Sequence, residues 1–444
     1  MIDLKELLNK TINNKLLYIS FLAFASYAYD YFYLFGLTGL RTFIKHVYLL
    51  WGIYLVLYML IKEKLCKDKQ ILAGLGFVGI CVISLLVNVV NKYNIANTLL
   101  VLFYLVILFG TMKTIKKEDA RSFITKGMKI IIILSFIITM GSFIALLTKQ
   151  INFRGWPHYG RYSGIYDEPG EAGASALMSI VFSLFMLDNK ADRKYKVFLW
   201  FNIAIQLLIQ YFSDSRTSWL CLILVLLVSS YYYLKNIRNS KFVLPKAVLF
   251  TCAMIVGLQF ATKPLITWAQ GYANAPMPEV IDRDFDASDV IGALDGGTED
   301  LYGEQHSKLY ILLDNGSSGR LSIWSSAIDV WKESPIIGKG YKNGGISYVL
   351  WEGLSMSHNL IFNLLPMTGI VGTVYFVVYL IWVLLPLLKI KDIAKNHDIF
   401  LWTFIGTVLI HSMLEYGIIC DFAIITLLFW LVVGYFNNNQ SEIN

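Results

Sequence analysis

Apolar runs long enough to cross a lipid bilayer recur along the whole chain. Hydrophobic residues make up 56% of the 444 residues and charged residues only 16%, whereas about a quarter of the residues of a soluble domain are charged. A helix needs about 20 mainly apolar residues to cross the hydrocarbon core of a bilayer. The sequence therefore predicts an all-α polytopic membrane protein and excludes an ordinary soluble domain.

We predict about twelve transmembrane helices from these runs. The tenth is 30 residues long and has Pro366, Gly369 and Gly372 near its start, which favours a broken or tilted helix. The connection before it, 262–358, is much longer than an ordinary loop and is expected to be partly helical. The predicted spans are 16–36, 43–61, 71–90, 94–112, 127–148, 172–187, 196–212, 218–234, 247–261, 359–388, 398–414 and 420–436.

Basic residues are unevenly divided between the two ends of these spans. The N-terminal segment and every second connection after it carry 24 of the 38 lysines and arginines. Because basic residues collect on the cytoplasmic side, both termini are predicted to be cytoplasmic, with a retained first span. The predicted organisation is spans one to nine (1–261), an extracytoplasmic loop (262–358), and spans ten to twelve with a tail (359–444).

Metal and disulfide sites are not indicated. The five cysteines form no CxxC pair, so neither a zinc site nor a disulfide framework is predicted. The acidic stretch with Asp282, Asp284 and Asp286 resembles the start of a calcium-binding EF-hand loop. That loop needs Gly at its sixth position and Glu at its twelfth, where this chain has Ala287 and Ala293. A solvated acidic loop is the better interpretation.

Arginines in the predicted outer loops are not explained by the positive-inside rule. Arg154 and Arg161 lie in the aromatic and glycine-rich connection 149–171, and Arg216 lies in the short turn "SDSRT" at 213–217. Arg154 and Arg161 could contact lipid headgroups, and the side chain of Arg216 could snorkel to the membrane interface. Guanidinium groups also bind phosphate oxygens in a bidentate way and stay charged, so the alternative is a site for a lipid diphosphate.

The second half of the long loop contains an amphipathic helix, "GRLSIWSSAIDVWKES". Arg320 opens it, and "SPIIGKG" ends it. We expect its apolar face toward the membrane interface or the protein body, with Arg320 close to that face. The residues of this face are Leu321, Trp324, Ile328 and Trp331.

Two histidines lie near the predicted outer ends of the last spans. His358 stands between Ser357 and Asn359 at the start of span ten, as a helix-end residue or as a catalytic base. His411 and Glu415 lie four residues apart on one helix face, either as a functional pair or as a pair that satisfies itself.

Four segments, which contain Arg161, Arg216, Arg320 and His358, resemble the O-antigen polymerase and ligase family. Members of this family are bacterial membrane glycosyltransferases of the GT-C type. The four segments are "GRYSGIYDEPGEAGA", "SDSRTSW", "GRLSIWSSAIDVWKESPIIGKGY" and "SHNLIFNLLPMTGIVG". The resemblance covers about 155–420 and is most specific at 316–372. One departure is Gly170 after Pro169, where many members have Pro-Asn.

The resemblance implies a reaction. Members transfer a glycan from undecaprenyl diphosphate to a sugar hydroxyl on the outer face of the bacterial cytoplasmic membrane, without metal or other cofactor. His358 corresponds to the general base, and Arg216 and Arg320 to the residues that stabilise the diphosphate leaving group. Further candidates for substrate binding are Arg161, Arg154, Trp324, Asn359, Glu415 and His411.

The acceptor distinguishes the functions that remain open. A polymerase uses a second lipid-linked repeat unit, and a ligase uses lipid A–core. The expected partners are the lipid-linked donor, one of these acceptors and the bilayer, with a flippase and a chain-length regulator as candidate proteins and no nucleic acid. A multi-pass transporter is the alternative from another class, but no second half resembles the first. Asp30, in the first predicted span, is assigned no role.

Overall fold

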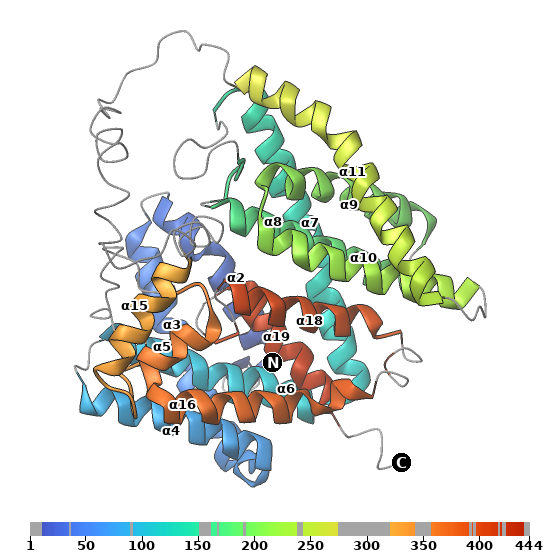
Figure 1. Ribbon diagram of the computed structural model, residues 1–444. Helices are drawn as coiled ribbons and strands as arrows, with labels where there is room; N and C mark the ends of the chain where they lie inside the picture. The colour runs from blue at the N-terminus through green and yellow to red at the C-terminus, as the bar shows by residue number, and fades with distance from the viewer. Residues whose placement is uncertain are drawn as a thin grey trace, which may run out of the picture.

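The computed structural model describes residues 11–34, 37–88, 92–150, 161–166, 168–189, 192–237, 243–273, 320–341, 357–389, 393, 397–415, 418–419 and 423–438. These residues form helices joined by turns and short connections (Figure 1). The longer helices are α2 (Lys15–Leu34), α3 (Thr38–Ile61), α4 (Lys69–Val87), α5 (Lys92–Leu102), α6 (Phe109–Thr114), α7 (Lys117–Leu147), α8 (Pro169–Asp188), α9 (Arg193–Ser213), α10 (Arg216–Ile237), α11 (Val243–Ala273), α15 (Arg320–Lys332), α16 (Leu360–Leu384), α18 (Ile399–Leu414) and α19 (Ile424–Phe436).

The prediction of an all-helical membrane protein is confirmed. Within the described residues, nine helices are long and apolar enough to cross a bilayer. Three shorter apolar helices, Lys15–Ser26, Ile399–Leu414 and Ile424–Phe436, coincide with the predicted first, eleventh and twelfth spans. The count of twelve therefore stays a prediction.

Two helices are longer than the sequence predicts. α7 begins at Lys117 rather than at 127, and α11 continues to Ala273 rather than ending at 261. The extension of α11 reaches the end of α7, where the Tyr272 hydroxyl donates to the Leu147 carbonyl at 2.9 Å. The predicted long loop thus begins later along the chain. Its acidic stretch lies outside the described residues.

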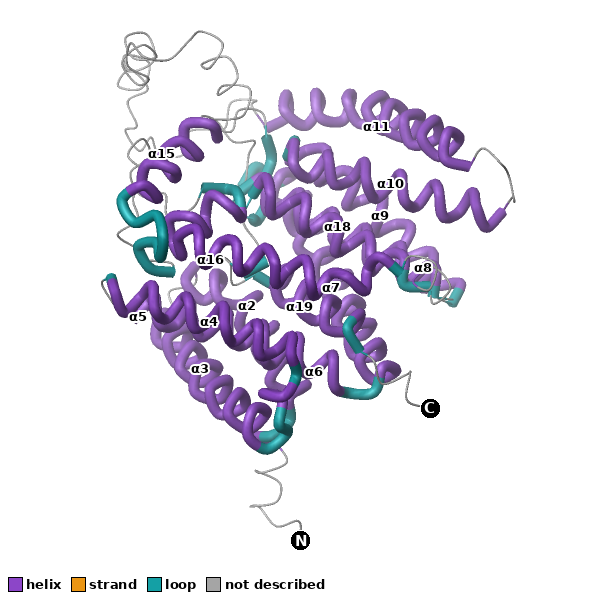
Figure 2. Tube along the Cα trace, turned by 60° about the horizontal axis from the view of Figure 1, so that its bottom comes forward, coloured by secondary structure: helices purple, strands orange, loops and turns teal. Residues whose placement is uncertain are grey.

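The core of the bundle surrounds a π-helical segment, η2 (Phe103–Leu108), between α5 and α6. All six of its side chains are fully buried. α6 packs against α19, where a Cβ on Gly434 would lie 2.5 Å from the Phe109 carbonyl oxygen. Figure 2 shows α10 and α11 side by side at one edge, and these two helices pack together directly.

α16 is interrupted at Gly369, as predicted for the tenth span. Gly369 has φ +65° and ψ −173°, outside the helical region. The break exposes backbone groups that the segment 335–340, directly after α15, then pairs. Lys339 N donates to the Pro366 carbonyl at 2.8 Å, and Ile370 N to the Pro335 carbonyl at 2.8 Å. A broken transmembrane helix is stable where neighbouring backbone satisfies the freed groups.

The close approach of these two backbones requires glycine on both sides. A Cβ on Gly338, which has φ +70°, would lie 2.5 Å from the Gly369 nitrogen, and one on Gly369 would lie 2.2 Å from the Ile336 carbonyl oxygen. Both glycines adopt the left-handed conformation that disfavours other residues. This junction therefore fixes α15, and with it Arg320, against α16.

Candidate active site

α15 presents Arg320 to the interior of the protein. Its deeply buried residues include Ile323, Ala327 and Val330. The buried face is thus offset by one position from the predicted face of Leu321, Trp324, Ile328 and Trp331, which is half-buried. The small side chains of Ser322, Ser326 and Ala327 let α15 pack against α16, whereas the indoles are too large for that contact and lie at its rim.

Trp324 joins α15 to the start of α16. Its ring stacks on Phe362, with 5.1 Å between ring centroids and 16° between planes. Its Nε1 donates to the Ser357 carbonyl at 2.9 Å. These contacts hold the residue before His358 in place. Trp324 was predicted to bind substrate, and the structure gives it this anchoring contact.

The turn before α10 carries Arg216 and lies directly against α8. Asp214 ends α9 in the left-handed conformation, with φ +43°, and Arg216 begins α10 two residues later. Gly173 on α8 permits the contact, since its Cβ would lie 2.7 Å from Ser218 Oγ and 3.1 Å from Ser215 Cβ. Two of the motifs that carry the resemblance therefore meet here.

Arg161 is held beside the same turn. Its Nε donates to the Ser213 carbonyl at 2.9 Å, and the next residue donates its backbone N–H to the Phe212 carbonyl at 2.9 Å. Gly164, with φ +61°, allows the segment to lie against α7, where a Cβ would be 2.3 Å from Ser142 Oγ. Arg161 and Arg216 are thus presented by neighbouring segments.

His358 is fixed by the residues on either side of it. Asn359 caps α16, because its side-chain oxygen accepts from the N–H groups of Ile361 at 2.8 Å and Phe362 at 3.2 Å. Its amide nitrogen donates to the Met413 carbonyl at 2.6 Å. With its oxygen and its nitrogen both in these bonds, Asn359 anchors α16 to the end of α18. Its contact with substrate stays a prediction.

The backbone of His358 has φ +50°, a conformation that costs energy for a residue other than glycine. Such strained residues persist where the surrounding structure determines them, and they are concentrated at functional sites. Ser357 supplies part of that constraint, since its N–H donates to Asn363 Oδ1 at 2.6 Å and its hydroxyl donates to the same oxygen at 3.0 Å.

Glu415 connects the histidine to an arginine. It caps the C-terminus of α18, and its Oε2 lies 2.9 Å from His358 Nδ1. Its Oε1 forms a short ion pair with Arg320 Nη2 and accepts from Thr217 Oγ1 at 3.4 Å. Glu415 was predicted to bind substrate or to pair with His411. Its carboxylate bridges α15, α10 and the residue before the cap of α16, and its role toward substrate stays a prediction.

The pKa of Arg161 is affected by burial and by the charges around it. Burial lowers the pKa of this guanidinium. The carboxylates of Asp214 and Glu415 act in the opposite direction, and the positive charges of Arg216 and Arg320 lower it further. These five groups therefore interact electrostatically at one end of the bundle. His358 joins them through its contact with Glu415. We call Arg161, Arg216, Arg320, Glu415 and His358 the Glu415 cluster.

Glu415 stays ionised within this cluster. Burial acts to raise its pKa, but the hydrogen bond from His358 and the positive charge of Arg320 outweigh burial and leave the pKa below the usual 4.5. An ionised carboxylate on Nδ1 holds the hydrogen of a neutral imidazole there, so the basic lone pair is on Nε2.

The structure thus brings together five of the residues that the sequence singles out, which are those of the Glu415 cluster. His411 lies one turn before Glu415 on α18 and interacts with its charge. Arg154 lies outside the described residues, as does the side chain of Asp30. Thr217, which the sequence analysis missed, follows Arg216 directly, and that adjacency was the available signal.

Metal-binding side chains were not predicted. Within the part of the chain that the structure describes, no three His, Cys, Asp or Glu side chains gather so as to hold a metal ion. The chemistry that the Glu415 cluster offers is anion binding by guanidinium groups and proton transfer by an oriented imidazole.

Comparison with known proteins finds a family similarity over part of the chain. No curated protein matches the chain. Residues 201–377 match the family model described as O-antigen ligase. That region begins in α9 and ends in α16, so it contains Arg216, Arg320 and His358. The match supports the resemblance carried by the motifs: residues 201–377 of this membrane protein are similar to the O-antigen ligase family.

Proposed function

We propose that this protein is a glycosyltransferase that polymerises oligosaccharide repeat units linked to undecaprenyl diphosphate, on the outer face of the cytoplasmic membrane. The observation that carries the proposal is the bridge formed by Glu415 between His358 and Arg320. It joins a base and an anion-binding group from segments far apart in the sequence, with Arg161 and Arg216 within electrostatic reach.

In the proposed step, the acceptor hydroxyl oxygen attacks the anomeric carbon of the donor glycan. The bond between that carbon and the diphosphate oxygen breaks, and its electron pair leaves with the diphosphate. The hydroxyl proton passes to His358 Nε2, the nitrogen opposite the one that contacts Glu415. General base catalysis of this kind contributes about 10²–10⁴-fold to a rate.

The arginines are assigned to the leaving group. Negative charge grows on the diphosphate as the glycosidic bond breaks. Guanidinium groups that are already in place stabilise that charge without having to reorganise. Arg320 and Arg161 are held by Glu415 and the Ser213 carbonyl respectively. These contacts support the assignment of both guanidinium groups to the diphosphate.

A ligase is the second candidate. It is favoured by the description of the matching family model, which names O-antigen ligase. The same base and arginines would serve a lipid A–core hydroxyl as the acceptor, because only the acceptor differs between the two reactions. The polymerase is preferred since it can operate in any bacterium with lipid-linked repeats.

The test replaces His358, Arg216 and Arg320 singly by Ala in the native host, followed by separation of the surface glycan on a gel. For a polymerase, the variants should leave single repeat units on the acceptor. For a ligase, long chains should accumulate on undecaprenyl diphosphate. If a well-expressed His358→Ala protein produces the same glycan as wild type, His358 is not the general base.

A further inference from the structure

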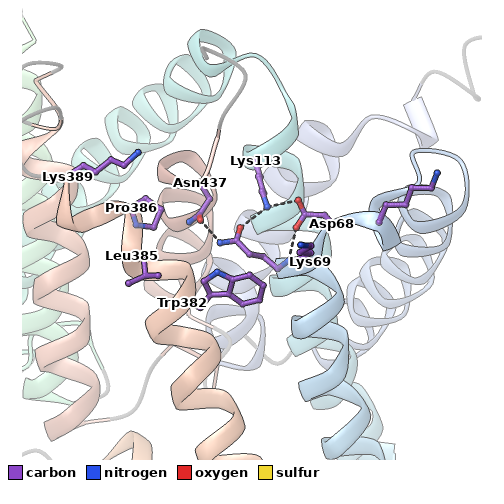
Figure 3. A pocket seen from close by; sticks show the side chains of 10 residues that line it. Asp68, Lys69, Lys113, Trp382, Leu385, Pro386, Lys389 and Asn437 are labelled. Carbon is purple, nitrogen blue, oxygen red and sulfur yellow. Dashed lines mark hydrogen bonds and ion pairs between the residues drawn. The ribbon is translucent and has the colours of Figure 1, made fainter. Parts of the chain in front are cut away.

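A second polar region lies at the opposite end of the bundle from the Glu415 cluster. It is a cavity of about 550 Å³ between the start of α4 and the ends of α6, α16 and α19 (Figure 3). This volume lies within the usual range for sites of small ligands, about 300–1,000 Å³. The surrounding connections are those whose lysines predict the cytoplasmic side.

The lining of this cavity is strongly basic. It includes four lysines, Lys67, Lys69, Lys113 and Lys389, and one acidic residue, Asp68, so its formal charge is four minus one, or +3. The single carboxylate is already engaged. Its Oδ1 caps α4 by accepting from Gln70 N at 2.9 Å and Ile71 N at 3.1 Å, and Oδ2 pairs with Lys113 at 2.5 Å.

The remaining lysines are positioned for an anion. Lys67, Lys69 and Lys389 are exposed, and no ion pair joins them to a described carboxylate. Behind them, a chain of hydrogen bonds forms a rigid polar floor: Lys113 Nζ donates to Gln70 Oε1 at 2.7 Å, and Gln70 Nε2 donates to Asn437 Oδ1 at 2.8 Å (Figure 3).

One wall of the cavity is apolar and faces outward. Trp382 and Leu385 line it with 37% and 49% of their surfaces exposed, and the neighbouring Leu388 is 74% exposed. Tryptophan prefers the level of the lipid headgroups. The cavity therefore combines a basic space large enough for a lipid headgroup with an apolar side, along which acyl chains can extend into the bilayer.

We infer that this cavity binds the phosphate ester of an anionic lipid headgroup from the adjacent leaflet. Lysines contact the phosphate oxygens, the Gln70 amide faces the glycerol hydroxyls, and Trp382 and Leu385 contact the acyl chains. Basic pockets between transmembrane helices on the cytoplasmic side are suited to such headgroups. This site is separate from the Glu415 cluster and does not depend on the proposed function.

The test is native mass spectrometry of the purified full-length protein, titrated with phosphatidylglycerol or with phosphatidylcholine of the same acyl chains. The test variant is Lys67→Gln/Lys389→Gln. Its control is Lys194→Gln/Lys196→Gln, which removes the same charge from exposed lysines of α9 outside the cavity. All four lysines are exposed, and none forms an ion pair with a described carboxylate, so folding should not be affected.

Wild type and control should prefer phosphatidylglycerol, and the test variant should lose at least about tenfold of that affinity, since each lysine near an anionic surface contributes roughly a fivefold factor. Equal losses in the two double variants would overturn the site. Glycerol 3-phosphate supplies the same phosphate ester without acyl chains. Its failure to displace the lipid supports the lipid as the occupant, and full displacement at equal concentration would overturn it.

Discussion

The two ends of α18 hold carboxylates in different ways. At its start, the side chain of Asp398 is only 3% exposed and lies 3.1 Å from Arg121 Nη2. It also accepts from the Tyr435 hydroxyl at 2.8 Å. A carboxylate at a helix N-terminus is favoured by the helix dipole. This ion pair joins α7, α18 and α19 and has the features of a structural contact.

At the other end, Glu415 occupies a position that the helix dipole disfavours for an anion. Its side chain is 19% exposed, and its neighbours Arg320 and His358 are 21% and 22% exposed. The partners are presented by segment ends rather than by packed helix faces. The comparison indicates that the pair of Asp398 and Arg121 maintains the fold. Glu415 instead holds the Arg320 guanidinium and the His358 imidazole where a ligand can reach them.

The largest effect that would sharpen this comparison is expected from His358→Ala. Transfer from a lipid-linked donor should fall by about 10²–10⁴-fold, because proton removal from the acceptor loses its base. The measurement is the initial rate per amount of folded purified protein. His46→Ala, on an exposed face of α3, is the matched control and should retain full activity. Similar rates in both variants would contradict the role of His358.

Arg320→Ala and Arg121→Ala test the two ends directly. Arg320→Ala should lower the turnover rate by about 10²–10³-fold, the usual cost of losing one group that stabilises developing charge. Arg121→Ala should instead lower the free energy of unfolding by about 3 kcal/mol, the lower end for breaking a buried pair, because Arg121 is 30% exposed.

The measurements are turnover per folded molecule and thermal unfolding in the same detergent. The comparison fails if Arg121→Ala lowers turnover as much as Arg320→Ala does while its thermal stability is unchanged. Conversely, a large loss of stability in Arg320→Ala with normal turnover would make its pair with Glu415 structural.

Much of this arrangement was predictable from the sequence. Long apolar runs determine the helices, because a bilayer leaves the backbone few other ways to satisfy its hydrogen bonds. The break in α16 follows from Pro366 and Gly369, and arginines outside the basic connections indicate the site. Arg320 was expected to point toward the membrane surface or the protein body, and it contacts Glu415 within the protein.

The partners of these residues were less predictable. Glu415 was paired with His411 on the basis of helical spacing, which describes neighbours within one helix only. Its actual partners, Arg320 and His358, are 95 and 57 residues away in the sequence, and only tertiary packing decides between such contacts. The buried face of α15 was missed for a similar reason, since small Ser and Ala side chains carry a weak hydropathy signal but allow close helix packing.

The junction that places Arg320 gives a smaller expected effect. Gly338→Ala puts a Cβ 2.5 Å from the backbone at Gly369 at a φ of +70°, so the segment 335–340 must shift on α16. Turnover should fall by about tenfold or more, since an error of 1 Å in position can cost about 10². Gly79→Ala on α4 has open space around its Cβ and should leave turnover unchanged. Normal turnover in Gly338→Ala would show that the junction is not needed to position Arg320.

The smallest effect concerns acid stability and Glu415→Gln. The native state lowers the pKa of Glu415, with the bond from His358 and the charge of Arg320 outweighing burial. A lowered carboxyl pKa adds stability that is fully present above the unfolded value, the usual 4.5, and is lost as the pH falls through the native value. The melting temperature of wild type minus that of Glu415→Gln should therefore be constant above about pH 5.5 and shrink below 4.5. A difference that grows as the pH falls would reverse the sign, and Glu415 would then resemble a buried acid that is neutral in the native state.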